Sequence, residues 1–440
     1  MESILEIHNA IKTAEKKASI IIIDALESNC GLGLDLVDQT NSSNSLFYMD
    51  NIDAIKKLIS SGYSELFDLI YLDPPFFTNL VFNKKVSIDT PNGRVKLKIP
   101  VYSDSWGKDP FQYLEMITIR LILMRELLSE VGTIYVHIDW RMVHYIRIIL
   151  DYVFGNDRFL NEIIWAYKSG GAGRRSFSKK HDNILVYTKT KNYIFNISKE
   201  KSYNRDFKPY KFKNIKEYKD EKGWFTLVNS KDVWNIDMVG RTSSERVDYA
   251  TQKPYKLLEK IVLTSSNKES LIGDFFAGSG TSLIVANNLQ RRWIGSDNSL
   301  HSFIQIKKRL KFIAAEFESF SEMKKESIKE LKGIKAMKID SFFEIDLSNI
   351  EVNLENDLNI NLKNNDVENI EFLKENAYLL LDYISIFSSS KSNKIEVEFF
   401  RPEINSKLLF TPIDKSLNNV YIETIDIWGN KYFNNIDGRN

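Results

Sequence analysis

The stretch Asp274-Phe275-Phe276-Ala277-Gly278-Ser279-Gly280-Thr281 decides which fold the sequence predicts. It joins an apolar run, Leu271–Phe276, that is typical of a buried strand to Thr281–Leu289, which has the pattern of a helix. Glycines between the two let the backbone approach a ligand closely, and the N-terminus of the helix offers free N–H groups. The stretch therefore predicts the strand–loop–helix unit of an α/β sheet that binds a nucleoside.

An acidic residue follows this unit at the distance that a nucleoside site requires. Asp297 closes the next expected strand, Trp293–Ser296, roughly nineteen residues after Gly278, where carboxylates bind ribose hydroxyls. Leu283 stands where the dinucleotide fingerprint has its third glycine, which favours an adenosyl-type ligand such as S-adenosylmethionine over NAD. No Gly-Lys-Ser/Thr phosphate loop follows, which argues against ATP hydrolysis.

Upstream, the tetrad Asp73-Pro74-Pro75-Phe76 ends an apolar run, Phe67–Leu72, that we expect to be a buried strand. Open α/β sheets bind their ligands at the carboxyl ends of such strands. The two prolines fix the backbone and remove two N–H donors, so carbonyl oxygens remain as the local hydrogen-bonding groups. The tetrad thus combines a carboxylate, a rigid carbonyl group and an aromatic ring.

This combination suits methylation of an aromatic amine, because the lone pair of such a nitrogen is delocalised into the ring. Hydrogen bonds from the two amine protons to Asp73 and to the Pro74 carbonyl would favour a pyramidal nitrogen whose lone pair points at a methyl sulfonium. Phe76 would stack on a base taken out of a duplex. The tetrad alone fits equally well a turn in which Asp73 is a cap and the prolines end the strand.

Strand and helix patterns alternate around both motifs, which predicts a mostly parallel α/β sheet covered by helices. Apolar residues recur at helical spacing from Leu114 to Leu128, and Thr133–Ile138 follows as a strand. A basic and aromatic region interrupts the alternation, which resumes at Pro254. The expected parts are an N-terminal extension (1–44), the tetrad-bearing half of the α/β domain (45–167), an insert (168–248), the glycine-loop half (249–315) and a small C-terminal α+β domain (316–440).

Composition places the chain among soluble globular proteins. Of its 440 residues, 43% are hydrophobic and 27% are charged, and the formal net charge is +1. The single cysteine, Cys30, excludes an intramolecular disulfide and a cysteine-rich zinc site. The sequence shows neither a signal-peptide pattern nor an apolar run long enough to span a bilayer, so we expect a cytoplasmic protein without a membrane segment.

The charge is unevenly distributed. Between Lys168 and Lys222, Lys and Arg exceed Asp and Glu by about ten, whereas from Asp340 onwards acids exceed bases by about nine. A basic middle region suits contact with a polyanion, although a solvated lysine-rich region fits the charge alone equally well. The leading phosphate-contact candidates are Arg174, Arg175, Lys179 and Lys180.

Together, the tetrad and the glycine loop resemble the catalytic and cofactor motifs of the beta-class DNA amino-methyltransferases. The catalytic motif precedes the cofactor motif, which is the order of that class, and the resemblance covers roughly residues 45–310. Several connecting segments are similar too. They are Tyr135–Asp139, Phe154–Asp157, Asn161–Trp165, Ser178–Lys189, Thr251–Pro254 and Arg291–Asp297.

The resemblance implies a Rossmann-like fold, S-adenosylmethionine as methyl donor and double-stranded DNA as substrate, within a restriction–modification system. It places catalysis at Asp73, Pro74, Pro75 and Phe76. It implies that Asp50 reaches the adenine of the cofactor and that Asp297 holds the ribose. The other expected cofactor-binding residues are Lys253 and, from the glycine-loop motif, Asp274, Phe276, Gly278, Gly280 and Thr281.

Two departures from the family pattern are visible. The cofactor motif reads Asp274-Phe275-Phe276 where many members have Asp-Pro-Phe, which leaves the glycine loop intact. The tetrad ends in Phe76 where Tyr is commoner, which removes a hydroxyl group but keeps the stacking face.

Several alternatives stay open. N4-methylation of cytosine needs the same pyramidal nitrogen, and Asp73 at the head of the tetrad favours adenine N6. Methylation of RNA or of a protein amide uses similar tetrads, and the basic insert favours DNA. An inactive binding module of the same fold would lack an intact tetrad and glycine loop. C5-methylation of cytosine is excluded because its cysteine nucleophile precedes proline, whereas Cys30 follows Asn29 and lies outside the sheet pattern.

No metal site is expected, because the spacing of His137, His144 and His181 forms no ligand cluster and the reaction needs no metal. The sequence leaves open whether the protein forms a homodimer and whether a cognate restriction endonuclease accompanies it.

Overall fold

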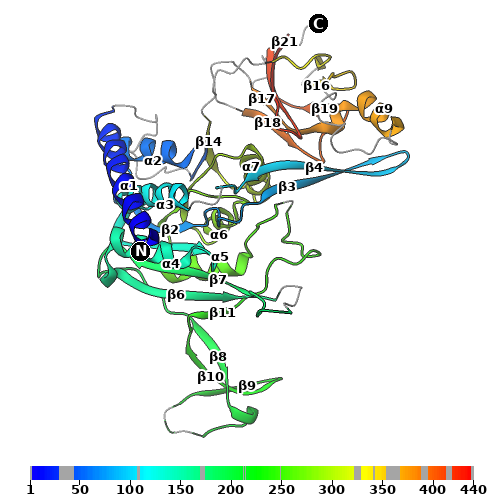
Figure 1. Cartoon of the computed structure of the whole chain (residues 1–440). Helices are drawn as coiled ribbons and strands as arrows, with labels where there is room; N and C mark the ends of the chain where they lie inside the picture. Colours follow the sequence, from blue (N-terminus) through cyan, green and yellow to red (C-terminus); the bar gives the residue numbers. More distant parts are fainter. Residues whose placement is uncertain are drawn as a thin grey trace. The chain divides into compact units, whose positions relative to one another are not determined.

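The computed structural model describes residues 2–28, 44–106, 110–168, 174–211, 213, 215–247, 249–321, 329–339, 342–352, 367–387, 395–412 and 419–437. Cys30 lies outside these residues. The chain divides into two compact units (Figure 1). Unit 1 comprises residues 1–80 and 104–321, and unit 2 comprises residues 81–103 and 322–440.

Unit 1 is built on a large α/β sheet. Its nine strands among the described residues follow the order β11-β6-β7-β5-β2-β12-β13-β1-β14. Only β7 runs antiparallel to its neighbours, so the mostly parallel sheet that the alternating pattern predicts is confirmed. The strands are β1 (Asn44–Tyr48), β2 (Phe67–Leu72), β5 (Leu128–Ile138), β6 (Phe159–Ala166), β7 (His181–Thr188), β11 (Val233–Asn235), β12 (Leu271–Asp274), β13 (Arg292–Asp297) and β14 (Phe317–Ser321).

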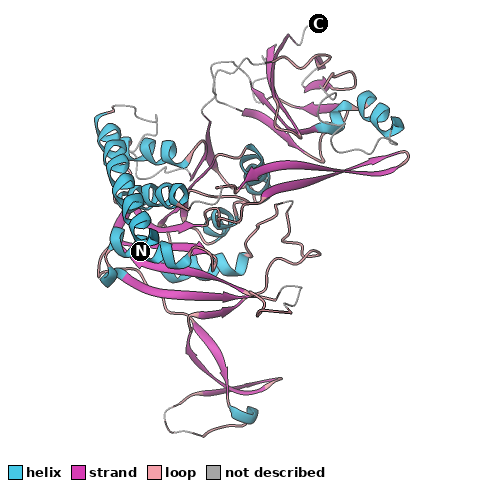
Figure 2. Ribbon diagram, viewed as in Figure 1, coloured by secondary structure: helices cyan, strands magenta, loops and turns pink. Residues whose placement is uncertain are grey.

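Helices cover both faces of this sheet, because successive strand side chains point to opposite sides. In β2, Ile70 and Leu72 belong to one buried cluster, whereas Leu69 and Tyr71 belong to another. The first cluster contains residues of α1 (Glu2–Glu27), α2 (Asn51–Ser60), α3 (Phe111–Leu127) and α4 (Val143–Phe154). The second contains residues of α5 (Tyr255–Ser265), α6 (Thr281–Asn288) and α7 (Leu300–Phe312). Helices α1 and α3 lie side by side (Figure 2).

The expected insert contains more regular structure than its composition indicates. Residues 181–188 form β7 inside the central sheet, where an apolar run is buried between β5 and β6. The basic and aromatic part folds as a small antiparallel sheet of β8 (Lys199–Tyr203), β10 (Gly223–Asn229) and β9 (Glu217–Asp220). This sheet extends away from the central sheet of unit 1 (Figure 1). We call residues 199–229 the β-arm.

Unit 2 consists largely of antiparallel strands. A hairpin of β3 (Val81–Thr90) and β4 (Gly93–Ser103) shares its core. One sheet joins β18 (Ile395–Phe400), β17 (Leu381–Phe387), β20 (Asn419–Asp426) and β21 (Lys431–Asp437). Another joins β15 (Lys335–Ile339), β16 (Phe342–Asp346) and β19 (Lys407–Phe410), and the helix α9 (Val367–Glu375) lies in the same unit. Strands with a helix agree with the expected α+β extension.

Two boundaries of the expected parts differ from the structure. Residues 81–103, which fall within the expected half 45–167, belong to unit 2, since Val86, Ile88 and Leu97 are buried in its core. Strand β14, which falls within the expected C-terminal part 316–440, pairs with β1 and belongs to unit 1. Within the described ranges, none of the helices has the length and apolar character that a membrane crossing requires.

Candidate active site

The tetrad lies at the carboxyl edge of the central sheet, directly after β2. Oδ2 of Asp73 accepts a hydrogen bond of 2.5 Å from Nζ of Lys253, which lies in the loop before α5. Oδ1 of Asp73 is buried and has no hydrogen-bond partner among the described residues. The tetrad therefore presents a carboxylate with one oxygen paired and the other free.

The rest of the tetrad is held by its neighbours. The hydroxyl of Tyr113 on α3 donates a hydrogen bond of 2.7 Å to the carbonyl of Pro75, so this carbonyl is already engaged. The ring of Phe76 lies with its centre 5.5 Å from the centre of the His137 ring and 5.1 Å from Nζ of Lys253. Phe76 and Asp73 thus both lie next to the ammonium group of Lys253.

A buried network lies behind Asp73, and the sequence did not reveal it. Nδ1 of His137, on β5, is 2.8 Å from the hydroxyl of Tyr71 and 3.8 Å from Oδ1 of Asp73. Nε2 of His137 is 3.3 Å from Oδ2 of Asp182, whose Oδ1 accepts a hydrogen bond from the Tyr167 hydroxyl. Burial, with the charge of Asp73 next, raises the pKa of Tyr71 well above its usual value. The Asp182 carboxylate can only accept, so Nε2–H of His137 donates to it, and the neutral Tyr71 hydroxyl lies within hydrogen-bond distance of Nδ1.

Asp182 stays ionised in this network. Burial alone would raise its pKa, but the hydrogen bond from His137 and the nearby charges hold the pKa below its usual value. The ionised carboxylate fixes the orientation of the imidazole, in the way that a carboxylate orients a histidine in other sites.

The glycine loop has the conformation that its sequence predicts. Gly278 and Gly280 have φ angles of 52° and 74°, in the left-handed region that favours glycine. A Cβ atom on Gly280 would lie 2.7 Å from Cγ1 of Ile306 on α7. Oδ2 of Asp297, at the end of β13, accepts a hydrogen bond of 2.8 Å from the N–H of Gly278. Thr281 begins α6 immediately after the loop.

Asp274 ties the start of the loop to α6. Its Oδ1 accepts from the N–H of Phe276 at 3.1 Å, and its Oδ2 accepts from the hydroxyl of Ser282. Burial raises the pKa of Asp274 to about 7, and burial also raises the pKa of Asp297 to about 6. Both oxygens of Asp274 are engaged inside the motif, so Asp274 shapes the loop.

Asp50 lies after β1, at the same edge of the sheet, since β1 pairs in parallel with β13. Its Oδ1 accepts a hydrogen bond of 2.9 Å from the N–H of Ile52 and so caps α2. Nη2 of Arg120, on α3, lies 3.3 Å from each carboxylate oxygen. The side chain of Asp50 remains 40% exposed. The ends of β1, β2, β12 and β13 thus bring Asp50, the tetrad, the glycine-loop motif and Asp297 to one edge of the sheet, and Lys253 reaches this edge through its contact with Asp73.

Comparison with known proteins identifies the family. The model of a family described as DNA methylase matches residues 67–308, which is more than half of the chain. The chain belongs to this family. Membership confirms the resemblance drawn from the sequence, the α/β methyltransferase fold, DNA methyltransferase activity and S-adenosylmethionine as methyl donor.

Individual relatives of this DNA methylase are distant. The type II methyltransferase M.EcaI of Enterobacter cloacae is 29% identical over 326 residues, which cover 60% of this chain and 69% of the relative. The type II methyltransferase M.HpaI of Haemophilus parainfluenzae is 29% identical over 274 residues, which cover 62% of this chain and 77% of the relative. The crystal structure of an M1.HpyAVI–SAM complex has a TM-score of 0.39 and 19% identity, and the match covers 60% of this chain and 98% of that one.

The predicted DNA contacts of the methylase lie at the same edge. The segment between β6 and β7 leaves and rejoins the sheet next to the carboxyl end of β5, because Ile138 pairs with Asn183. Arg174, Arg175 and Lys179 are exposed in this segment, and Lys180 is half-buried. Nζ of Lys179 lies 4.2 Å from the ring centre of Trp140, and Phe177 is fully exposed. Lys179 and Trp140 thus place a cation and an aromatic ring at the sheet edge at which the tetrad also lies.

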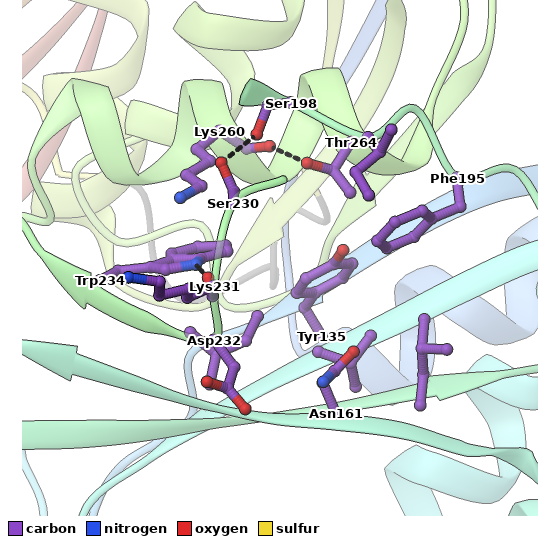
Figure 3. A pocket seen from close by; sticks show the side chains of 14 residues that line it. Tyr135, Asn161, Phe195, Ser198, Ser230, Lys231, Asp232, Trp234, Lys260 and Thr264 are labelled. Carbon is purple, nitrogen blue, oxygen red and sulfur yellow. Dashed lines mark hydrogen bonds between the residues drawn. The ribbon is translucent and has the colours of Figure 1, made fainter. Parts of the chain in front are cut away.

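A pocket of unit 1 contains none of the predicted site residues. It lies where the β-arm joins the sheet and is lined by side chains such as Tyr135, Asn161 and Trp234 (Figure 3). Hydroxyls of Ser198 and Ser230 are 2.8 Å apart beside it, at the base of the β-arm.

Across the described residues, no group of three or more His, Cys, Asp or Glu could hold a metal ion.

Proposed function

We propose that this methylase transfers the methyl group of S-adenosylmethionine to N6 of adenine in double-stranded DNA. The observation that carries the proposal is the carboxylate of Asp73, which has a free oxygen and stands beside Phe76 at the cofactor edge of the sheet. Asp73 at the head of the tetrad favours adenine over cytosine. N4-methylation of cytosine is the second candidate, because its amine needs the same two acceptors.

The residues at this edge fit S-adenosylmethionine. An adenosyl group offers an exocyclic amine and ribose hydroxyls as donors, and carboxylates are suited to both. Asp50 has a partly exposed carboxylate, and Asp297 lies on the adjacent strand beside the glycine loop. Asp50 would accept from the adenine amine and Asp297 from the ribose. The backbone at Gly278 and Gly280 would lie along the methionine portion.

The chain's own groups then prepare the target amine. When bound, S-adenosylmethionine supplies a methyl group on a positively charged sulfur. Asp73 and the Pro74 carbonyl accept the two amine protons, so the nitrogen becomes pyramidal and its lone pair turns towards the methyl group. Phe76 stacks on the flipped base and holds its plane. The new N–C bond would replace the sulfur–methyl bond, S-adenosylhomocysteine would leave as the neutral thioether, and the carboxylate of Asp73 would take the proton that the amine must lose. Alignment supplies most of the acceleration.

The DNA contacts are part of the same proposal. Arg174, Arg175, Lys179 and Lys180 would neutralise phosphates near the flipped base, and the β-arm would read the duplex. We propose that the enzyme works with a cognate restriction endonuclease in the cytoplasm, the compartment that holds the DNA of the bacteria from which its relatives come. A homodimer stays an expectation.

Modified-base analysis tests the proposal. The full chain and its Asp73→Ala variant are expressed in a methylation-free bacterial host, and the DNA is digested to nucleosides for mass spectrometry. N6-methyladenine with the wild type alone would support the proposal. N4-methylcytosine would keep the mechanism and overturn the choice of base. Neither modified base, from a chain that binds S-adenosylmethionine in calorimetry, would overturn the proposed substrate.

A further inference from the structure

Arg120 places a buried guanidinium between two residues that follow β1. Nε of Arg120 donates a hydrogen bond of 2.6 Å to Oδ1 of Asn51, and Nη2 lies 3.3 Å from both carboxylate oxygens of Asp50. Nη1 donates to the carbonyl of Met116 on the same helix. The Arg120 side chain is only 10% exposed. Its fork therefore fixes two neighbouring side chains at once, which a point charge could not do.

Asn51 extends this contact to the cofactor motif. Its Nδ2 donates a hydrogen bond of 3.0 Å to the carbonyl of Phe275, just before the glycine loop. Asn51 itself is buried. One guanidinium thus links the segment after β1, which carries Asp50, to the segment after β12, which carries Gly278 and Gly280. Both segments are expected to touch the cofactor.

Packing alone gives no reason for an arginine at this position. The helix around it contributes apolar side chains to the core, including Ile117, Leu121 and Met124. Burial lowers the pKa of Arg120, and the charge of Asp50 only partly offsets that effect. Burying a charged group is unfavourable, and a well-packed apolar residue often stabilises a core more. An arginine that is buried here at such a cost has to act through the groups it holds.

We propose that Arg120 is a positioning residue of the cofactor site. It holds the Asp50 carboxylate from one side, and the N–H of Ile52 at the start of α2 holds Oδ1. The exposed lone pairs of the carboxylate then face the adenine amine of the cofactor. Arg120 thereby sets how strongly the site prefers an adenosyl ligand to one without that amine. This inference rests on the role proposed above for Asp50.

Calorimetry with two cofactor products tests the inference on the full chain. S-Adenosylhomocysteine carries the amine, whereas S-inosylhomocysteine has a carbonyl oxygen in its place. The wild type is expected to bind the adenosyl compound at least about tenfold more tightly, because a carboxylate facing a carbonyl gains no hydrogen bond. Arg120→Met is expected to lose most of this preference. The control Arg125→Met, on the same helix but 45% exposed, is expected to keep it.

The outcomes distinguish the proposed role of Asp50 from that of Arg120. A wild type without preference would show that Asp50 does not read the amine, which overturns its proposed role and this inference together. A wild type with preference, and an Arg120→Met variant with the same ratio of affinities, would overturn the role of Arg120 alone. Equal weakening of both ligands would mean that Arg120 only stabilises the fold. If Arg120→Met does not fold, Arg120→Lys replaces it: a lowered ratio supports the inference, and an unchanged ratio overturns it.

Discussion

The ammonium group of Lys253 lies 2.5 Å from Oδ2 of Asp73, although the two residues are 180 positions apart in the sequence. Both side chains are largely buried, with exposures of 12% and 18%. The same ammonium lies 5.1 Å from the ring centre of Phe76. Lys253 therefore holds Oδ2 of Asp73 beside Phe76, and it leaves Oδ1, the oxygen that the target amine is proposed to use, without a hydrogen bond.

Removing the ammonium should destabilise the fold, because it leaves the Asp73 carboxylate buried without its partner. Lys253→Met is expected to lower the free energy of unfolding by about 3 kcal/mol. Denaturant titration measures the change. The double variant Lys253→Met/Asp73→Asn is the control, and it should regain most of the loss because no unpaired charge remains. Equal stability of the wild type and the single variant would contradict the buried ion pair.

Asp73→Asn tests the acceptor role of the tetrad. The amide keeps the size of the side chain but replaces one acceptor oxygen with a donor, so the target amine loses a hydrogen bond as it becomes pyramidal. Turnover should fall by about a hundredfold or more, while the affinity for S-adenosylmethionine changes little. Transfer of a labelled methyl group to DNA measures turnover, and calorimetry measures the affinity for S-adenosylmethionine. Asp89→Asn, an exposed residue of unit 2, serves as control. Wild-type turnover in the Asp73 variant would refute the mechanism.

The position of the tetrad and of the glycine loop could be predicted because each is a local pattern. A strand that ends in Asp73 and a loop with two glycines before a helix need no knowledge of distant residues. The place of His137 could not be predicted in this way. It lies beside Asp73 because β2 and β5 pair with Leu72 opposite Val136, and that register depends on packing between distant segments.

The hairpin of residues 81–103 shows a second reason why part of the fold could not be predicted from the sequence. Its side chains alternate, since Val86 and Ile88 on one strand and Val95 and Leu97 on the other are buried while their neighbours are exposed. Alternation predicts a half-buried strand but does not say which core buries it. The core belongs to unit 2, whose other residues begin at 322.

Gly280→Ala should weaken cofactor binding. The new Cβ would lie 2.7 Å from Ile306, and alanine would have to adopt a φ of 74°. We expect the affinity for S-adenosylmethionine to fall about tenfold or more, and the free energy of unfolding to fall by about 1 kcal/mol. Calorimetry and denaturant titration measure the two effects. Gly240→Ala is the matched control, because nothing lies within 4 Å of its Cβ position. If both variants bind the cofactor like the wild type, the loop does not form the cofactor site.

The buried carboxyl of Asp274 predicts a pH dependence of stability. Burial raises its pKa from 3.8 to about 7 in the folded chain. A raised pKa means that the folded state binds the proton more tightly, so the contribution of Asp274 to stability is full below about pH 4 and is lost as the pH rises through about 7. The free energy of unfolding of the wild type minus that of Asp274→Asn should therefore fall by at least about 1 kcal/mol between pH 4 and pH 8. Denaturant titrations at both pH values check this, and a difference that is constant or rises with pH would refute it.

The basic segment before β7 should account for part of the salt dependence of DNA binding. Each phosphate contact that is removed lowers the slope of log affinity against log salt by about 0.9. Arg174→Gln/Arg175→Gln is therefore expected to lower the slope by about 1 to 2 and to weaken binding to all DNA sequences alike. Fluorescence anisotropy of a labelled duplex over a range of salt concentrations measures the slope. Lys96→Gln/Lys98→Gln removes two exposed cations from unit 2 and is the matched control, with no change expected. Equal effects of the two double variants would show that the basic segment has no special role and that the charge of the whole chain governs the slope.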